Sequence, residues 1–232
     1  MNFEWNTNTI KWYQEANAYT GFFSHIAEHI VPKLEDVRTL CDIGCGLGLL
    51  DLELAKYIEQ ITCVDINANA IDALKQEIQR RKIDTITPSL MDFHTMNKQF
   101  DAIVISFFGS RSIEELLPFC KKLFAIVGDQ SEQILFPNKY RNFHRNRPEH
   151  VAEWLLENGV PYEAEEVSYE FGQPFLNQEE AKRFVCSLSP AISKEELKQF
   201  LEKALVSTTN NQYPLYLPHK KHVTIFTIPG RG

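Results

Sequence analysis

Three glycines alternate with other residues in the stretch LCDIGCGLGLLDLELA, residues 40–55. Gly44, Gly46 and Gly48 lie between an apolar run, predicted as a strand, and the start of a predicted helix. Where a strand leads directly into a helix, the first helical N–H groups are unpaired and point to one place, and glycine lets a ligand approach the backbone. An isolated Gly-x-Gly is as often a tight turn that binds nothing. Residues elsewhere in the chain are needed to distinguish a ligand-binding loop from a tight turn.

Two aspartates at the ends of the next two predicted strands favour a ligand. Asp65 ends the second strand about twenty residues after the glycines, where a doubly wound fold places a carboxylate that accepts hydrogen bonds from ribose hydroxyls. Asp92 follows the third strand, where it can meet an adenine edge. A single Asp at a strand end is usually a turn or helix cap. Ligand-facing features at three successive strand ends predict a nucleoside site.

The residues around the glycines distinguish between nucleoside cofactors. The dinucleotide pattern G-x-G-x-x-G needs a glycine at position 49, where Leu49 stands. Asp42 precedes the first glycine by two positions, and its carboxylate opposes a pyrophosphate but suits a cationic amine and a sulfonium. The charge therefore favours S-adenosylmethionine over NAD.

Apolar runs and helical periodicity alternate around these residues and predict the elements that position them. The predicted strands are 39–43, 60–66, 86–90, 100–107, 133–136, 162–171 and 222–228. The predicted helices are 9–20, 21–31, 49–58, 69–82, 113–125, 148–158, 177–187 and 193–206. This alternation is typical of a mostly parallel sheet covered by helices.

Four segments in this order make the sequence resemble the class I S-adenosylmethionine-dependent methyltransferases of small-molecule type. They are DIGCGLGL at 42–49, VDIN at 64–67, MDF at 91–93 and FDAIVIS at 100–106. The resemblance covers about residues 40–135. It implies a doubly wound, Rossmann-like α/β fold with a mostly parallel seven-stranded sheet in the order 3-2-1-4-5-7-6 and an antiparallel last strand. The link 172–221 before that strand departs from the family by its length and is predicted to be a helical insertion.

The resemblance also implies a role for each matching position. The backbone around Gly44, Cys45 and Gly46 would line the methionine part of S-adenosylmethionine, with Asp42 near its amine, and Asp65 would hold the ribose. The remaining positions implied are Ile66 on one adenine face, Asp92 on the adenine amino group, Phe93 nearby, and the Ser106 backbone, which would close the site. For Ile66 and Phe93, ordinary packing is an equal alternative.

Methyl transfer from a sulfonium is an in-line displacement, whose rate can come from desolvating and aligning the acceptor, so a base is optional. We expect the acceptor chamber above the strand ends, under the N-terminal helices and the 172–221 segment. Its candidate residues, most of them expected to serve packing, are Tyr13, Tyr19, Phe22, Phe23, His25, Phe107 and Phe108. The Asn/Asp-Pro-Pro-aromatic motif that binds amide or adenine amines is replaced by FFGS at 107–110, which argues against those acceptors.

A basic tract, NKYRNFHRNRPEH at 138–150, follows the predicted fifth strand. A solvated loop is the favoured interpretation. Alternatively, Arg141 and its neighbours bind an anionic group or RNA, and His144 acts as a base. Carboxylates at suitable spacing are missing, so the tract does not predict a metal site.

Composition bounds the remaining possibilities. The 232 residues carry a formal net charge of −7, which opposes general nucleic-acid binding. The five cysteines lie mostly in apolar segments and predict no disulfides, and neither a secretory signal nor a membrane span is evident, so we expect a cytoplasmic protein. We expect one domain, with an N-terminal helical cap at 1–35, a cofactor-binding core at 36–136 and the insertion at 172–221.

Three hypotheses remain open at this point. The first is an enzyme that methylates an O, N or C atom of a small molecule and releases S-adenosylhomocysteine. The second is a catalytically silent partner subunit that binds S-adenosylmethionine, because no base or acceptor motif is evident. The third is an RNA methyltransferase that uses the tract 139–147. A homodimer is also left open.

Overall fold

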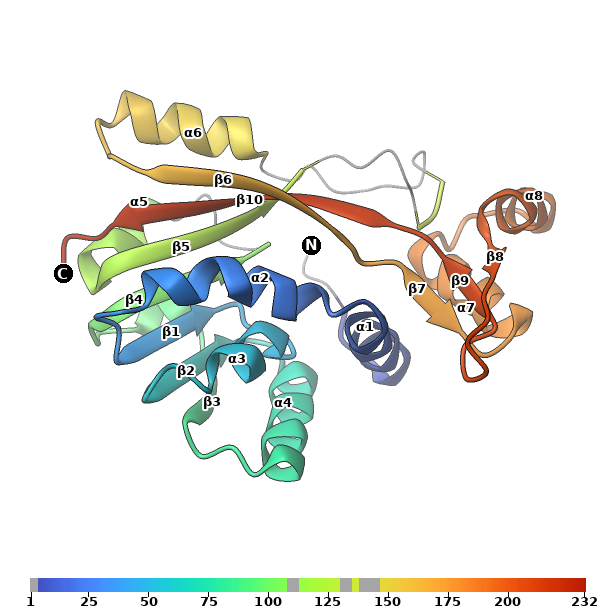
Figure 1. Ribbon diagram of the computed structural model, residues 1–232, viewed down its shortest axis with the longest axis horizontal. Helices are drawn as coiled ribbons and strands as arrows, with labels where there is room; N and C mark the ends of the chain where they lie inside the picture. The colour runs from blue at the N-terminus through green and yellow to red at the C-terminus, as the bar shows by residue number, and fades with distance from the viewer. Residues whose placement is uncertain (1–3, 108–112, 130–134, 138–146) are drawn as a thin grey trace.

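The computed structural model describes residues 4–107, 113–129, 135–137 and 147–232 (Figure 1). A seven-stranded sheet runs through it in the order β3-β2-β1-β4-β5-β10-β6. Its strands are β1 (Thr39–Ile43), β2 (Gln60–Asp65), β3 (Ile86–Leu90), β4 (Phe100–Ser106), β5 (Cys120–Gly128), β6 (Glu163–Glu170) and β10 (Lys220–Pro229). Neighbours from β3 to β5 pair in parallel, and β10 is antiparallel to both β5 and β6. The predicted strand order and the antiparallel last strand are confirmed.

The central strands are apolar on both faces because helices cover both sides of the sheet. On β4, Val104 packs in the cluster that includes the α2, α3 and α4 residues, whereas Ile103 packs in the cluster that includes α5 and α6 residues. The helices are α1 (Thr7–Thr20), α2 (Phe22–Ile30), α3 (Leu49–Leu54), α4 (Ala68–Arg81), α5 (Ile113–Leu116), α6 (Pro148–Glu157), α7 (Gln178–Leu188) and α8 (Lys194–Ala204). Figure 1 shows α2 and α3 on the near side of the sheet.

The sequence prediction was wrong around the fifth strand. The predicted helix 113–125 ends at Leu116, continues as a short 3-10 turn, Leu117–Phe119, and is followed by β5. Pro118 explains the stop, because it lacks an N–H donor and its ring clashes with the preceding turn. The apolar run 123–127 is buried in β5, and a short apolar run cannot be assigned to helix or strand by periodicity alone. The strand predicted at 133–136 is not found at Leu135 and Phe136, which form a bend; 133 and 134 lie outside the described residues.

The segment before the last strand contains more than helices. Besides α7 and α8 it forms a three-stranded sheet in the order β7-β9-β8, from β7 (Gln173–Phe175), β8 (Val206–Ser207) and β9 (Leu215–Leu217). Strands of two or three residues carry too little alternation to be read from sequence. Figure 1 shows this insertion beyond the far ends of β6 and β10, with α1 between it and α4.

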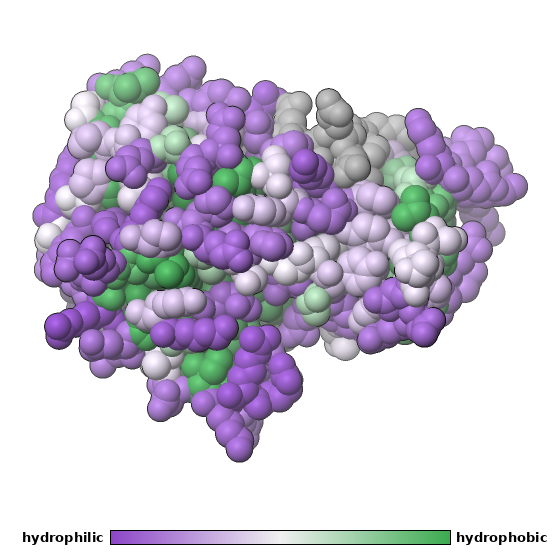
Figure 2. Space-filling view, viewed as in Figure 1, coloured by the Kyte–Doolittle hydropathy of each residue, from purple (hydrophilic) through white to green (hydrophobic). Residues whose placement is uncertain are grey.

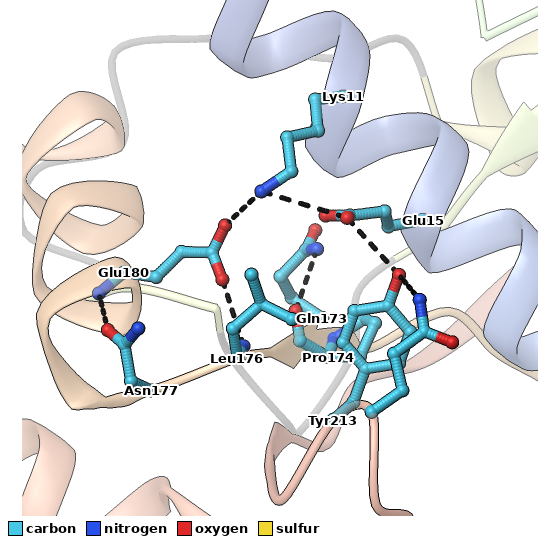
Figure 3. A network of polar contacts seen from close by, with 9 residues as sticks. Lys11, Glu15, Gln173, Pro174, Leu176, Asn177, Glu180 and Tyr213 are labelled. Carbon is cyan, nitrogen blue, oxygen red and sulfur yellow. Dashed lines mark hydrogen bonds and ion pairs between the residues drawn. The ribbon is translucent and has the colours of Figure 1, made fainter.

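A polar network attaches α1 to the insertion (Figure 3). The Lys11 ammonium bonds the Glu180 carboxylate and lies 3.7 Å from Glu15 Oε1. Glu180 Oε2 accepts a hydrogen bond from Leu176 N at 2.9 Å, and the Tyr213 hydroxyl donates to Glu15 Oε1 at 3.2 Å. Glu180 is only 2% exposed. The buried carboxylate therefore connects α7 with the helix that leads from the N-terminus.

In the view of Figure 2, hydrophilic side chains cover most of the surface and apolar ones are scattered among them. Within the described ranges, none of the helices combines the length and the apolar character needed to cross a bilayer.

Candidate functional site

The loop between β1 and α3 has the geometry that its glycines permit. Gly44, Gly46 and Gly48 have φ of 72°, 53° and 62°, the left-handed region that other residues rarely adopt. A Cβ at position 48 would lie 2.5 Å from Leu74 Cδ1, and one at position 46 would lie 3.0 Å from Trp5 Cζ2. Close approach of α4 and of the N-terminal indole therefore requires glycine at both positions.

The N–H groups of this loop are bonded to the end of β2. Gly44 N and Cys45 N donate to Val64 O at 2.7 and 3.1 Å, and Gly46 N donates to Asp65 Oδ2 at 2.9 Å. A loop that cradles phosphate directs such N–H groups at the anion. Because these three donors already have protein acceptors, the loop does not present them to a pyrophosphate.

Asp65 faces the glycine loop from the tip of β2. Besides the Gly46 bond, its Oδ1 accepts a hydrogen bond from Asn67 N at 2.8 Å. Each carboxylate oxygen has a second lone pair, so Asp65 retains acceptor capacity for hydroxyl groups. The next residue, Ile66, is 59% exposed, which places a large apolar side chain on the surface beside this carboxylate.

Asp92 lies at the end of β3 and caps the short 3-10 turn Phe93–Thr95. Its Oδ1 accepts from His94 N at 3.1 Å and lies 2.7 Å from His94 Nδ1. These contacts with His94 lower the pKa of Asp92, which is solvent-exposed. The Phe93 ring centroid lies 3.9 Å from that of His94. Asp92 therefore acts as a cap here, and its carboxylate is ionised. It follows β3, the edge strand that pairs with β2.

Two buried carboxyl groups lie at the glycine loop, on the strand that enters it and the helix that leaves it. Asp42 on β1 is 2% exposed, and Asp51 on α3 is fully buried. Among the described residues, Asp42 Oδ1 and both carboxylate oxygens of Asp51 lack an unambiguous hydrogen-bond donor. Burial raises the pKa of both groups, and the proximity of the two side chains raises that of Asp42 further. The pair therefore retains protons more strongly than ordinary aspartates do.

Asp51 was not predicted as a site residue. Its only signal in the sequence is an acid within the apolar stretch LLDLEL, which a helix of unknown orientation could place in solvent. Cys63, which is buried, and Cys45, which is half-buried, lie beside the two carboxyl groups, and burial raises the pKa of the Cys63 thiol. The neighbours of the two carboxyl groups are thus thiols and a third acid, Asp65.

Aromatic side chains form a continuous row from the glycine loop to the tip of β4. We call Trp5, Tyr13, Phe171, Phe22 and Phe107 the aromatic wall. Successive ring centroids along it lie 5.3, 5.1, 4.7 and 6.3 Å apart. The Trp5 end contacts Gly46, and the Phe107 end follows Ser106, the last residue of β4. The wall therefore runs from the loop after β1 to the tip of β4.

The predicted acceptor residues are only partly brought together. Tyr13, Phe22 and Phe107 lie on the aromatic wall, whereas Tyr19 packs on Tyr216 of the insertion at 5.0 Å between ring centroids. The other candidates divide similarly: Phe23 contacts the wall at Phe171, His25 stacks on Tyr169, and Phe108 lies outside the described residues. Trp5 and Phe171 were missed, because nothing in the sequence links such distant aromatic residues.

Of the remaining predicted site residues, some lie among the residues that the structure describes and others do not. Ser106 Oγ is buried without a hydrogen-bond partner among the described residues. Arg141 and His144 lie outside the described residues, as does most of the basic tract. Arg147, which is described, directly precedes α6.

Comparison with known proteins identifies residues 40–128 as a methyltransferase domain. Demethylmenaquinone methyltransferase of Leptospira interrogans is 26% identical over 136 residues, which cover 53% of this chain and 54% of that protein. The chain thus spans about half the length of this relative.

Two solved structures share the fold. A proposed methyltransferase of Bacillus halodurans C-125 has a TM-score of 0.59 at 13% identity, covering 89% of this chain and 97% of that one. Magnesium protoporphyrin IX methyltransferase of Synechocystis PCC 6803 with bound S-adenosylhomocysteine has a TM-score of 0.55 at 12% identity, covering 99% and 90%.

Proposed function

Because this chain belongs to the class I S-adenosylmethionine-dependent methyltransferase family, we propose that it transfers a methyl group from S-adenosylmethionine to a small molecule. The methylated atom would be O, N or C. The observation that carries the proposal is the glycine loop, faced by Asp65 and flanked by two buried acids. This arrangement suits a positively charged nucleoside without phosphates.

The donor set fits S-adenosylmethionine in charge and polarity. The acids at the loop, Asp42, Asp51 and Asp65, favour a sulfonium and an ammonium and oppose a pyrophosphate. The N–H groups of Gly44, Cys45 and Gly46 are bonded to β2, so a ligand that needs no phosphate cradle is favoured. The residues proposed to hold the cofactor are Asp42, Gly44, Cys45, Gly46, Asp65, Ile66, Asp92, Phe93 and Ser106.

When bound, S-adenosylmethionine supplies an electrophilic methyl group, so the protein has to position and desolvate the acceptor. Asp65 would fix the ribose through its spare lone pairs, and the exposed Ile66 would cover one face of the adenine. The aromatic wall would exclude water between the glycine loop and the tip of β4. A dedicated base is not required for acceptors that are already ionised.

Two lines of support favour a small acceptor. The relatives and structural neighbours described above include enzymes named for demethylmenaquinone and for magnesium protoporphyrin IX. The formal net charge of −7 opposes a nucleic-acid substrate. The partner-subunit alternative predicts cofactor binding without turnover over a broad panel of acceptors.

Calorimetric titration of S-adenosylhomocysteine into the pure protein tests the proposal. We expect binding that Asp65→Ala weakens by about 1.5 to 3 kcal/mol, the range for hydrogen bonds to charged groups. Asp72→Ala is the matched control, because Asp72 lies on the exposed side of α4 with a side chain that is 66% accessible. No heat and no change in melting temperature with the wild-type protein would refute the proposed function.

A further inference from the structure

His94 lies between two acidic side chains just beyond the tip of β3. Its Nδ1 lies 2.7 Å from Asp92 Oδ1, and its Nε2 lies 3.6 Å from Glu115 Oε2 on α5. The ring centroid of Phe93 lies 3.9 Å from that of His94. The imidazole is therefore restrained, because each of its nitrogens faces an acid and the ring packs against a second aromatic ring.

The hydrogen bonds to the Asp92 side chain fall on one of its two carboxylate oxygens. Oδ1 faces His94 Nδ1 and also accepts from His94 N at 3.1 Å. Because the ionised carboxylate can only accept, His94 Nδ1 is the donor in the first contact. Two donors thus occupy the lone pairs of Oδ1. Within the described part of the chain no donor lies on Oδ2, which keeps its acceptor capacity.

The backbone at Asp92 is fixed independently of its side chain. Thr95 N and Thr95 Oγ1 donate to Asp92 O at 3.0 and 2.7 Å, within the short 3-10 turn that Asp92 caps. With the backbone held in this way, the remaining freedom of Asp92 is the rotation of its carboxylate. The bond from the His94 ring restricts that rotation.

The sheet places this carboxylate beside the strand tip that carries Asp65, at the edge formed by β2 and β3 (Figure 1). Asp65 pairs with Leu90 in the parallel register, and Met91 N donates to Asp65 O at 3.1 Å. Asp92 is the next residue along the chain, and its side chain is 57% exposed. A ligand that reaches Asp65 from outside the strand tips can therefore also reach Asp92.

We propose that His94 is a positioning residue that keeps Asp92 Oδ2 free and fixes its direction, so that Asp92 selects a nucleobase with an exocyclic amino group. The assignment to the base of the cofactor rests on the proposed function. An ionised carboxylate accepts a hydrogen bond from the 6-amino group of adenine, and it finds no donor when hydrogen replaces that group. His94 acts through Asp92 and does not itself touch the ligand.

Two ligands that differ only at the 6-position of the base test this selection. Calorimetric dissociation constants are measured for S-adenosylhomocysteine and for its 6-deamino analogue, in which hydrogen replaces the amino group. We expect the wild-type protein to bind S-adenosylhomocysteine about tenfold more tightly, near the lower limit for a hydrogen bond to a charged group, because water competes at an exposed carboxylate. Equal dissociation constants would overturn the inference.

Variants at position 94 separate a hydrogen-bond donor from a side chain that only fills space. His94→Leu should lower the preference to about threefold, because the bond from the backbone N–H remains. His94→Asn should keep the preference, because its amide offers a donor in place of Nδ1.

The matched control is His150→Leu, the same change at an exposed histidine of α6, and His94→Ala replaces His94→Leu if that protein does not fold. A side chain that merely supports the turn would weaken both ligands equally. An unchanged preference in His94→Leu, or an equal loss in His94→Leu and His94→Asn, would therefore overturn the role of His94.

A double variant shows whether His94 acts through Asp92. Asp92→Ser removes the carboxylate but keeps an oxygen that can cap the turn, and it should bind the two ligands equally. Adding His94→Leu to Asp92→Ser should then leave the ratio of the two dissociation constants unchanged, because the two residues form one interacting unit. A further change in this ratio would overturn the positioning role.

The same measurements distinguish this inference from the proposed function. If neither ligand binds the wild-type protein, the proposed function fails and this inference fails with it. If both ligands bind equally well, only the selection by Asp92 and His94 fails, and the proposed function stands.

Discussion

Replacing Asp51 by asparagine should stabilise the ligand-free protein at neutral and alkaline pH. Asp51 is fully buried, and among the described residues neither of its carboxylate oxygens has an unambiguous hydrogen-bond donor. Contacts with Asp42 and Cys63 lower its pKa, but burial raises it by more. Burial raises its pKa from 3.8 to about 6. Once Asp51 is ionised, this rise in its pKa corresponds to a loss of about 3 kcal/mol of unfolding free energy, because a pKa difference of one is worth about 1.4 kcal/mol. In the Asp51→Asn variant the side-chain amide would carry no charge and would donate to the carboxyl group of Asp42.

The sign of the pH dependence follows from proton binding. Between pH 4 and 6 the folded protein holds the Asp51 proton more tightly than the unfolded chain does, so stability falls as pH rises through this window. Above pH 6 the full penalty for the buried charge persists. Asp51→Asn should therefore match the wild-type protein near pH 4 and exceed it at pH 8, with a melting temperature higher by roughly 6–12 °C at about 2–4 °C per kcal/mol.

Melting curves of both proteins from pH 4 to 8 provide the measurement. Asp101→Asn is a control of opposite sign, because the Asp101 carboxylate accepts from Thr39 N at 2.9 Å and pairs with Lys121 at 2.8 Å. The Lys121 pairing and these bonds hold the pKa of Asp101 far below its ordinary value, so that variant should lose stability at pH 8. If Asp51→Asn melts below the wild-type protein at pH 8, by the same margin at every pH, the buried carboxylate has a partner and the reasoning fails.

Two further substitutions test the loop and the insertion, and a second measurement on Asp51→Asn tests the cofactor site. Gly48→Ala should lose more stability in denaturant unfolding than Gly159→Ala; both residues have φ of 62°, but only at position 48 would the Cβ meet Leu74. Equal losses would contradict the close packing of α4. Glu180→Gln should cost about 1–3 kcal/mol and speed hydrogen exchange in α7. Burial raises the pKa of Glu180, but the bonds from Lys11 and Leu176 N and the Lys11 charge together outweigh it and lower that pKa. Unchanged exchange would show that the network does not hold the insertion. On the same Asp51→Asn samples, calorimetry should show weaker binding of S-adenosylhomocysteine than in the wild-type protein. The reason is that the variant lacks a negative charge that the proposed site places near the ligand amine. Equal binding by the two proteins would place Asp51 outside the cofactor site.

Local patterns predicted the elements that carry the cofactor site. Strand β1 and strand β3 have the predicted bounds, and β2 ends at Asp65, one residue before the prediction. The pattern worked here because each strand is a short apolar run followed by a turn or a capped helix. It failed at β5, where the helical periodicity of 113–117 was extended past Pro118 into an apolar run.

Short stretches of the chain were enough to predict the glycine loop and the carboxylate at the tip of β2, because each depends on residues close together in the sequence. The strand order was predicted only through the resemblance that four such stretches bear to a known family. The surroundings of that loop emerge from long-range packing instead. Asp42 and Asp51 become a buried pair when α3 packs against β1, and Lys221 meets Phe107 when β10 inserts between β5 and β6. These packing contacts join residues that are far apart in the chain. The burial and the charge at the site therefore depend on tertiary packing and cannot be read from a local sequence pattern.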